Sequence, residues 1–248
     1  MGLSLFYLNK AICMNIIITG ASRGIGFETA KRFAANPGNH IIAIARDESK
    51  LQNLRKACLQ QNINANLYPI TFDLENMDLF EIRLLADIQT NISSIDILIN
   101  NAGLLINKPF DKLNEEEINR MIQLNLTAPA ILIKSLLPLM NKPGHIINIS
   151  SMGGFQGSQK FPGLAIYSAA KAGLATLTEC LAEEYKNTGL VFNCLAIGST
   201  DTEMLRKAFP GYQASFKANE MAEFIVDFAL NKHRFFNGKI IPVSISTP

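Results

Sequence analysis

A tyrosine and a lysine stand four residues apart in the segment Tyr167-Ser168-Ala169-Ala170-Lys171, downstream of the serine pair Ser150-Ser151. Residues four apart on a helix share one face, so the phenol and the ammonium can point into one crevice. A free tyrosine titrates near ~10, and a neighbouring cation favours the phenolate and lowers that pKa. The pair could therefore exchange a proton with a substrate near neutral pH. A tyrosine and a lysine on a solvent-exposed helix face would show the same spacing.

A glycine-rich segment, Thr19-Gly20-Ala21-Ser22-Arg23-Gly24-Ile25-Gly26, follows a short β-branched run near the N-terminus. Glycines let a backbone turn tightly and approach a pyrophosphate, and the free amides of a helix that begins there attract negative charge. An ordinary glycine-rich turn has the same composition. The strand before the segment and the helix after it favour a dinucleotide-binding site.

The residues at the end of the second strand bear on which dinucleotide is bound. NAD-binding enzymes usually carry Asp or Glu there, whereas a 2′-phosphate requires positive charge. This position is Ala45, followed by Arg46, and Arg23 lies in the glycine segment. Because a guanidinium binds phosphate oxygens in a bidentate way, the sequence predicts NADP (NADPH) rather than NAD. Asp47, one place later, is expected to cap the following helix or to face solvent.

Two further short motifs follow the third and fourth strands. Asp73-Leu74 is expected where an adenine edge would pass, and Asn100-Asn101-Ala102-Gly103 offers small residues and backbone groups beside the cofactor. Either motif alone would be a mere turn. Their positions after consecutive strands favour contact with the cofactor.

The elements that must position these groups alternate between short β-branched runs and longer stretches of helical period. The predicted strands cover residues 15–19, 41–45, 67–72, 95–99, 145–150 and 190–195, with a last strand within 237–243. The predicted helices cover residues 25–35, 49–61, 114–140 and 165–187. This alternation predicts an α/β fold, a Rossmann-type doubly wound parallel sheet with helices on both faces. Its ligand crevice lies beyond the carboxyl ends of the strands.

The domain organisation is expected to be simple. Nothing interrupts the alternation, so residues 14–248 are predicted to form one domain. Residues 1–13 are interpreted as a dispensable leader, because Met14 stands directly before the first strand and could be the natural start.

Composition excludes several classes of partner. The net charge is +2 and charged residues make up 18% of the chain, so we expect neither nucleic acid nor a membrane surface as partner. Four cysteines without CxxC spacing and three scattered histidines predict no metal site. The apolar runs are shorter than a membrane span and no export signal is evident, so the expected location is cytoplasmic.

In this order and at these intervals, the glycine segment, Asp73-Leu74, the NNAG segment, Asn125, the serine pair and YxxxK resemble the short-chain dehydrogenase/reductase family. The match runs from about residue 15 to residue 202. The resemblance implies an NADPH-dependent oxidoreductase that reduces a ketone or aldehyde, or runs the reverse reaction. A small-molecule carbonyl or alcohol is the implied substrate. The alternatives are an NAD-dependent alcohol dehydrogenase of the same family and a non-catalytic dinucleotide-binding regulator.

The resemblance also implies roles for individual residues. Tyr167 is the expected general acid and base, and Lys171 is expected to lower its pKa and to hold the nicotinamide ribose. Ser151 is expected to hydrogen-bond the substrate oxygen, with Ser150 and Ser158 as alternatives. Asn125 is expected to hold a water that links Lys171 to solvent, although a satisfied core asparagine would look the same. The predicted cofactor-binding residues are Gly20, Ser22, Arg23, Gly24, Ile25, Gly26, Arg46, Asp73, Leu74, Asn101, Ala102, Gly103, Tyr167, Lys171, Gly198 and Thr202.

Several features depart from the family pattern or remain open. Ile197 replaces the usual proline before Gly198, the loop between Ser151 and Tyr167 is enlarged, and the frequent VDGG ending is missing. Residues 199–219 carry Met204, Leu205, Phe209 and Tyr212, which either cover an apolar pocket or pack on the body of the fold. The apolar helical runs 121–140 and 165–181 either form the interfaces of a homodimer or homotetramer or face the sheet.

Overall fold

The computed structural model describes residues 13–245 of the 248-residue chain. The predicted leader, residues 1–13, lies outside the described residues except for the exposed Cys13.

Seven parallel strands form the central sheet in the order β3-β2-β1-β4-β5-β6-β9. They are β1 (Asn15–Thr19), β2 (His40–Ala45), β3 (Asn66–Thr71), β4 (Ile95–Asn100), β5 (Met140–Ser151), β6 (Leu190–Ile197) and β9 (Lys239–Val243). β1 pairs with β2 on one side and with β4 on the other, so the strand order reverses there. In sheets wound this way the ligand crevice opens at that reversal, beyond the carboxyl ends of the strands.

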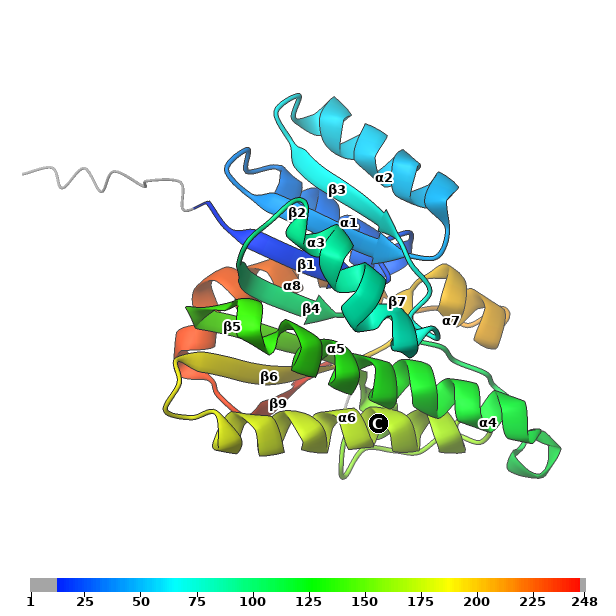
Figure 1. Ribbon diagram of the computed structural model, residues 1–248. Coiled ribbons are helices and arrows are strands. Elements are labelled where there is room, and N and C mark those ends of the chain that lie inside the picture. The colour runs from blue at the N-terminus through cyan, green and yellow to red at the C-terminus, as the bar shows by residue number, and fades with distance from the viewer. Residues whose placement is uncertain (1–12, 246–248) are drawn as a thin grey trace, which may run out of the picture.

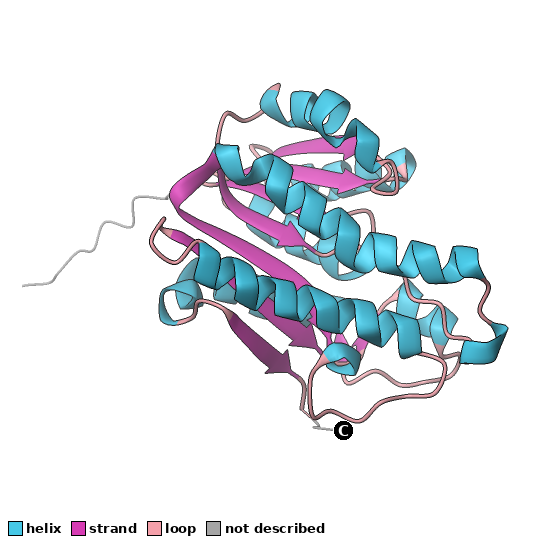
Figure 2. Cartoon of the chain, turned by 60° about the horizontal axis from the view of Figure 1, so that its bottom comes forward, coloured by secondary structure: helices cyan, strands magenta, loops and turns pink. Residues whose placement is uncertain are grey.

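Helices cover both faces of the sheet, which confirms the predicted fold class (Figure 1). One face carries α1 (Gly24–Ala34), α2 (Glu48–Gln61) and α8 (Ala218–Asp227), packed around Phe33, Leu54 and Phe228. The other carries α3 (Leu85–Gln89), α4 (Glu115–Ile122), α5 (Ala128–Leu136) and α6 (Ala165–Glu184). Strands buried on both faces must be apolar throughout, and Ile16, Ile17 and Ile18 of β1 are fully buried. Figure 2 shows the α4–α5 stretch and α6 side by side on one face.

The predicted helix over 114–140 is a composite of four segments. Asn114 begins α4 with a capping box that it shares with Glu117. A π-helical turn, η4 (Gln123–Thr127), joins α4 to α5, and a 3₁₀ turn, η5 (Leu137–Leu139), ends the stretch at Pro138. Proline lacks the N–H that a continuing helix requires. The strand expected at 145–150 begins earlier, at Met140, which lies opposite Ile95 of β4.

Over the described residues, the stretch Glu115–Leu139 is long and apolar enough to cross a membrane by length and composition. In this fold Leu124, Leu132 and Leu136 of that stretch are buried in the core beside the sheet. One face of the stretch therefore packs against the sheet, while 39% of its most apolar 18 residues are buried in all.

Two regions contain structure that the sequence patterns did not predict. Phe80, Leu84 and Ile88 recur every four residues and bury one face of η2 (Phe80–Leu84) and α3. The segment 199–219 contains β7 (Thr200–Asp201), α7 (Glu203–Ala208) and β8 (Phe216–Lys217). Figure 1 shows α7 beyond the carboxyl ends of the strands, where it borders the expected crevice.

Candidate active site

The glycine-rich segment forms a tight turn between β1 and α1. Gly20 and Gly24 have φ values of 68° and 57°, which side-chain-bearing residues rarely adopt. A Cβ atom on Gly26 would stand 2.4 Å from the Gly20 carbonyl oxygen, so only glycine lets α1 start this close to the turn. Arg23 is the N-cap of α1, and its guanidinium bonds Glu203 instead of the first-turn amides. Those amides are the groups that bind a phosphate at a helix N-terminus.

The segment after β4 is fastened to the same turn. The Thr19 hydroxyl accepts hydrogen bonds from the backbone N–H groups of Asn101 and Ala102, both at 3.0 Å. The Asn101 side chain donates to the Thr19 carbonyl oxygen at 3.0 Å. Asn101 therefore joins the ends of β1 and β4, and its neighbours Ala102 and Gly103 are held at the rim of the sheet.

A cavity of about 320 Å³ opens over these strand ends. Most of the predicted cofactor residues line it: Gly20, Ser22, Arg23, Gly24, Ile25, Arg46, Asp73, Leu74, Asn101, Ala102, Gly103, Tyr167, Lys171 and Thr202. Gly26 is packed beneath the turn, and Gly198 lines a second cavity next to this one. We call the first one the charged cavity, because Arg23, Arg46, Lys50, Asp73 and Glu203 are among its walls.

The two arginines predicted to bind a 2′-phosphate are both held by carboxylates. Arg46 Nη1 lies 3.2 Å from Glu75 and 3.7 Å from Asp73, and Arg23 pairs with Glu203. The Arg120 side chain donates to both carboxylate oxygens of Glu75, at 3.0 and 2.9 Å, and this holds the pKa of Glu75 below its usual range. An anion that binds at this end of the charged cavity must compete with these carboxylates.

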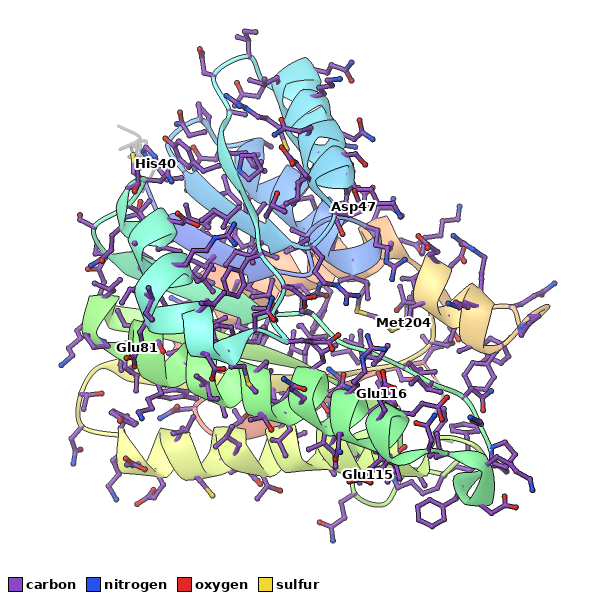
Figure 3. The ribbon with its side chains drawn as sticks, turned by 45° about the vertical axis from the view of Figure 1, so that its right-hand side comes forward. His40, Asp47, Glu81, Glu115, Glu116 and Met204 are labelled. Atoms are coloured by element: carbon purple, nitrogen blue, oxygen red, sulfur yellow. The ribbon has the colours of Figure 1, made fainter. Side chains whose placement is uncertain are left out.

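Asp47 caps α2, as predicted. Its carboxylate accepts a hydrogen bond from the Lys50 backbone N–H at 3.0 Å, and this bond lowers the pKa of Asp47. The cap directs the first turn of α2 toward the charged cavity, where the Lys50 ammonium lies 3.3 Å from Glu203. Figure 3 shows Asp47 and Met204 on opposite sides of the opening between α2 and α7.

Sequence reasoning missed Lys50 and Glu203 as cavity residues. For Lys50 a signal existed, because a residue three places after the N-cap of a helix that follows the second strand lies near the crevice. Glu203 gave no such signal, since α7 had not been predicted. Within residues 13–245, no three His, Cys, Asp or Glu side chains are grouped so that they could hold a metal ion.

A second cavity of about 330 Å³ adjoins the first. The two share Ile25, Tyr167, Ile197, Thr202 and Met204. The four apolar residues of the predicted cover, Met204, Leu205, Phe209 and Tyr212, line the second cavity. It also receives Ser151 from the end of β5 and Phe161 and Leu164 from the enlarged loop. Tyr167 thus lies at the junction of the two cavities.

Tyr167 is buried, and the Ser151 side chain interacts with its phenol. Burial raises the pKa of Tyr167, and the interaction with Ser151 opposes that rise. Lys171 is not among the causes of this shift, so the expected lowering of the pKa by Lys171 stays a prediction. Desolvation dominates at Tyr167, while the Lys171 ammonium donates to the Ile149 carbonyl oxygen at 2.8 Å.

Ser151 is the one of the three candidate serines that contacts Tyr167. The Ser150 hydroxyl donates to the Lys171 carbonyl oxygen at 2.8 Å inside the core. The Ser158 hydroxyl donates to the Met152 and Phe155 carbonyl oxygens within the enlarged loop. Both alternatives therefore hold backbone in place.

Asn125 is fully buried in the π-helical turn η4. Its side chain donates to the carbonyl oxygens of Leu104 and Met121, at 2.7 and 2.8 Å, and accepts from the Leu104 N–H at 3.2 Å. A Cβ atom on Gly103 would lie 2.7 Å from Asn125 Oδ1 and 3.4 Å from Lys171 Nζ, so these two side chains flank Gly103. The amide is used for backbone contacts, and the water relay stays a prediction.

Helix α6 is docked on β5 by close backbone approach and by buried polar contacts. A Cβ atom on Gly154 would stand 2.7 Å from the Ala172 backbone nitrogen, so Gly154 permits the approach. The Asn148 side chain donates to the Thr178 hydroxyl at 2.9 Å, about two helical turns beyond Lys171. Sequence reasoning missed Gly154, although a pair of glycines directly after a strand could have indicated it.

Comparisons with known proteins bear on this arrangement. The family model described as short chain dehydrogenase matches residues 14–213. A fatty acyl-CoA reductase from Acinetobacter baylyi is 34% identical over 217 residues, which is 85% of this chain and 70% of that relative. A dehydrogenase/reductase from Sinorhizobium meliloti has a similar structure, with a TM-score of 0.81, 25% identity and coverage of 93% of each chain. A Burkholderia cenocepacia short chain dehydrogenase, solved in complex with NADP, gives a TM-score of 0.81 at 23% identity, covering 92% of this chain and 95% of that one.

The buried ammonium of Lys171 predicts a pH-dependent stability. Burial lowers the pKa of Lys171 from 10.5 to about 8, with the nearby Cys194 thiol opposing the shift. Above about pH 8 the folded protein loses this proton while the unfolded chain keeps it, so stability rises with pH until about pH 10.5. The quantity to follow is the free energy of unfolding of the wild type minus that of Lys171→Met. This difference should rise by roughly 1 kcal/mol between pH 7 and pH 9.

Urea denaturation of the cofactor-free proteins at each pH measures this difference. Lys186→Met, which removes an exposed lysine near the end of α6, controls for the loss of one charge. If the difference between wild type and Lys171→Met is flat over this range, or falls, Lys171 does not carry the depressed pKa.

Proposed function

Since the chain belongs to the short-chain dehydrogenase/reductase family of oxidoreductases, we propose that it reduces a ketone or an aldehyde reversibly, with NADPH as the hydride donor. The observation that carries the proposal is the position of Tyr167. Its phenol lies where the charged cavity meets the second cavity, and Ser151, which interacts with it, lines the second cavity too. A group bound in one cavity and a group bound in the other would meet beside that phenol.

The proposed chemistry divides between the cofactor and the chain. When bound, the reduced nicotinamide supplies a hydride to the carbonyl carbon. Tyr167 donates its phenolic proton to the carbonyl oxygen, and Ser151 stabilises the negative charge that develops there. The phenol of Tyr167, whose pKa is raised by burial, is protonated at neutral pH and can therefore act as the proton donor. In oxidation the same phenol, deprotonated, would accept the proton of the alcohol.

Lys171 and Asn125 are proposed to support this proton transfer. A pKa of about 8 leaves the Lys171 ammonium mostly protonated at neutral pH. From its position beside Gly103 it is proposed to hold the nicotinamide ribose and to return a proton to Tyr167. Asn125, across Gly103, is proposed to connect Lys171 to solvent through a water.

NADPH is proposed as the cofactor because three cations, Arg23, Arg46 and Lys50, line one end of the charged cavity. Glu75 is held in two hydrogen bonds by Arg120, so it stays paired if Arg46 turns to a phosphate. The structurally similar Burkholderia cenocepacia protein was solved with NADP, which agrees with this choice. The second candidate is NAD, favoured by the carboxylates of Glu75, Asp73 and Glu203 that hold both arginines.

Three expectations from the sequence are kept as proposals. Residues 14–248 act as one domain, the protein is cytoplasmic, and it forms a homodimer or homotetramer. The helices α4, α5 and α6 lie together on one face, which supports the assembly through the runs 121–140 and 165–181 (Figure 2).

Tyr167→Phe should lower kcat/KM for a simple diketone by 100-fold or more, because the proton donor is lost, a contribution of about 10²–10⁴ in such enzymes. The Kd for NADPH, from fluorescence titration, should stay within about twofold of the wild-type value. Tyr185→Phe is the matched control: this tyrosine ends α6 and its ring contacts Phe192, away from the cavities. Near-normal turnover by Tyr167→Phe would remove the mechanism.

Glu203→Gln should tighten NADPH binding by about threefold, the effect expected when an exposed ion pair stops competing for a ligand. NADH binding should change little, since NADH has no 2′-phosphate. Glu223→Gln, which removes a surface pair with Arg32 at 2.7 Å, controls for the loss of one surface carboxylate. Equal effects on both dinucleotides, or tighter binding of NADH than NADPH by the wild type, would contradict the assignment of Arg23 and Lys50 to a phosphate.

A further inference from the structure

We propose that the second cavity selects an uncharged carbonyl compound with an apolar body and rejects ketones that carry an anionic group beside the carbonyl. This inference rests on the proposed carbonyl reduction and specifies the substrate class. It is carried by the chemistry of the cavity walls, which contrasts with that of the charged cavity.

The walls of the second cavity differ from those of the charged cavity in their charge. No Asp, Glu, Lys, Arg or His is found among the described residues that line the second cavity. The charged cavity next to it is lined by both acidic and basic side chains. An anionic group that enters the second cavity would lose its hydration without gaining a cation, and desolvation of an unpaired carboxylate is costly.

Two cations that flank this cavity in the sequence are engaged elsewhere, and a third, Lys207, is exposed and does not line the cavity. The Lys160 ammonium, in the enlarged loop, donates to the Phe155 carbonyl oxygen at 2.6 Å and to the Ser158 hydroxyl at 2.7 Å. Arg206, on α7, pairs with Asp201. Neither side chain lines the cavity. A carboxylate on the substrate therefore has no cation poised to receive it among the residues that form this site.

The second cavity also has an apolar wall. Phe161 and Leu164 come from the enlarged loop, and Leu205, Phe209 and Tyr212 come from the segment after β6. The rings of Phe209 and Tyr212 lie 6.3 Å apart in a tilted arrangement. Phe161 and Tyr212 are 42% and 55% exposed, so the mouth of the cavity presents aromatic surface that an apolar substrate body would cover.

Several polar side chains in the lining of the second cavity hydrogen-bond the nearby chain. Thr200 donates to the Gly198 carbonyl oxygen at 3.3 Å, and Thr202 accepts from the Leu205 N–H at 3.2 Å. The Ser199 hydroxyl accepts from the Ser215 N–H at 3.1 Å. These three hydroxyls therefore stabilise the backbone of residues 198–215, which cover the cavity. Ser151 and Tyr167 then mark the end of the cavity beside the charged cavity, and the other polar side chains of the lining, Ser244 among them, are uncharged hydroxyls. A substrate is thereby oriented with its carbonyl oxygen toward Ser151 and Tyr167.

A matched pair of ketones tests the inference: ethyl benzoylformate and free benzoylformate share the ring and the reacting carbonyl but differ in charge. In each reaction NADPH gives a hydride to the ketone carbon and a proton goes to its oxygen, which yields the alcohol and NADP⁺. With the full chain and saturating NADPH, kcat/KM for the anion should be at least 100-fold lower than for the ester. Equal kcat/KM values would overturn the inference.

A charge placed in the wall provides the reciprocal test. Leu205→Arg should raise the anion-to-ester ratio of kcat/KM at least tenfold, whereas Leu205→Gln, of similar polarity but without charge, should not. Thermal melting checks that both variants fold. A ratio that does not move in a folded Leu205→Arg would contradict the proposed role of the uncharged wall.

Binding separates failure of the inference from failure of the proposed function. Saturation-transfer NMR on Tyr167→Phe with NADPH reports whether each ketone binds without turnover. If the ester binds and the anion does not, while the wild type reduces neither, the selectivity stands and the carbonyl reduction is wrong. Binding of the anion as tightly as the ester would overturn the selectivity whatever the turnover.

Discussion

The docking of α6 on β5 is the constraint on which the site depends. Lys171 bonds the Ile149 carbonyl oxygen, Ser150 bonds the Lys171 carbonyl oxygen, and Asn148 bonds Thr178, all within 2.8–2.9 Å and buried. Breaking any one of these contacts would leave a buried polar group without a partner, which is costly. The three bonds therefore fix the height of α6 along the strand, and with it the position of Tyr167. The pKa of Lys171 is lowered because burial disfavours its charged form.

The site is divided by electrostatics more than by shape. Two cavities of similar size, about 320 and 330 Å³, share one wall, yet one is lined by charged groups and the other by none among its described residues. A charged dinucleotide and an apolar carbonyl compound would each be matched by one of them. In the charged cavity, cations and carboxylates are already paired. Selectivity for NADPH over NADH therefore depends on how much more strongly these cations bind a 2′-phosphate than they bind their present carboxylates. Such differences are small for exposed groups.

Much of the fold and of the site could be predicted from local patterns. The glycine turn, the end of β2 at Ala45 and the start of α6 at Ala165 are where the sequence places them, while β4 ends one residue later than predicted and α6 three residues earlier. These features depend on short-range rules: hydrophobic period, glycine geometry and helical spacing. Short elements were missed, as with α3 and α7, whose five and six residues are too few to show a period by themselves.

The sequence by itself determined the parallel sheet, the order of the motifs along its carboxyl edge and the side chains capable of proton transfer, because each follows from residues close in the chain. Tertiary structure alone decided which serine contacts Tyr167, which carboxylates hold Arg23 and Arg46, and that burial raises the pKa of the phenol. These outcomes depend on contacts between residues far apart in the chain, such as Arg23 with Glu203, and on how much water the packing removes. Neither quantity is encoded in local spacing.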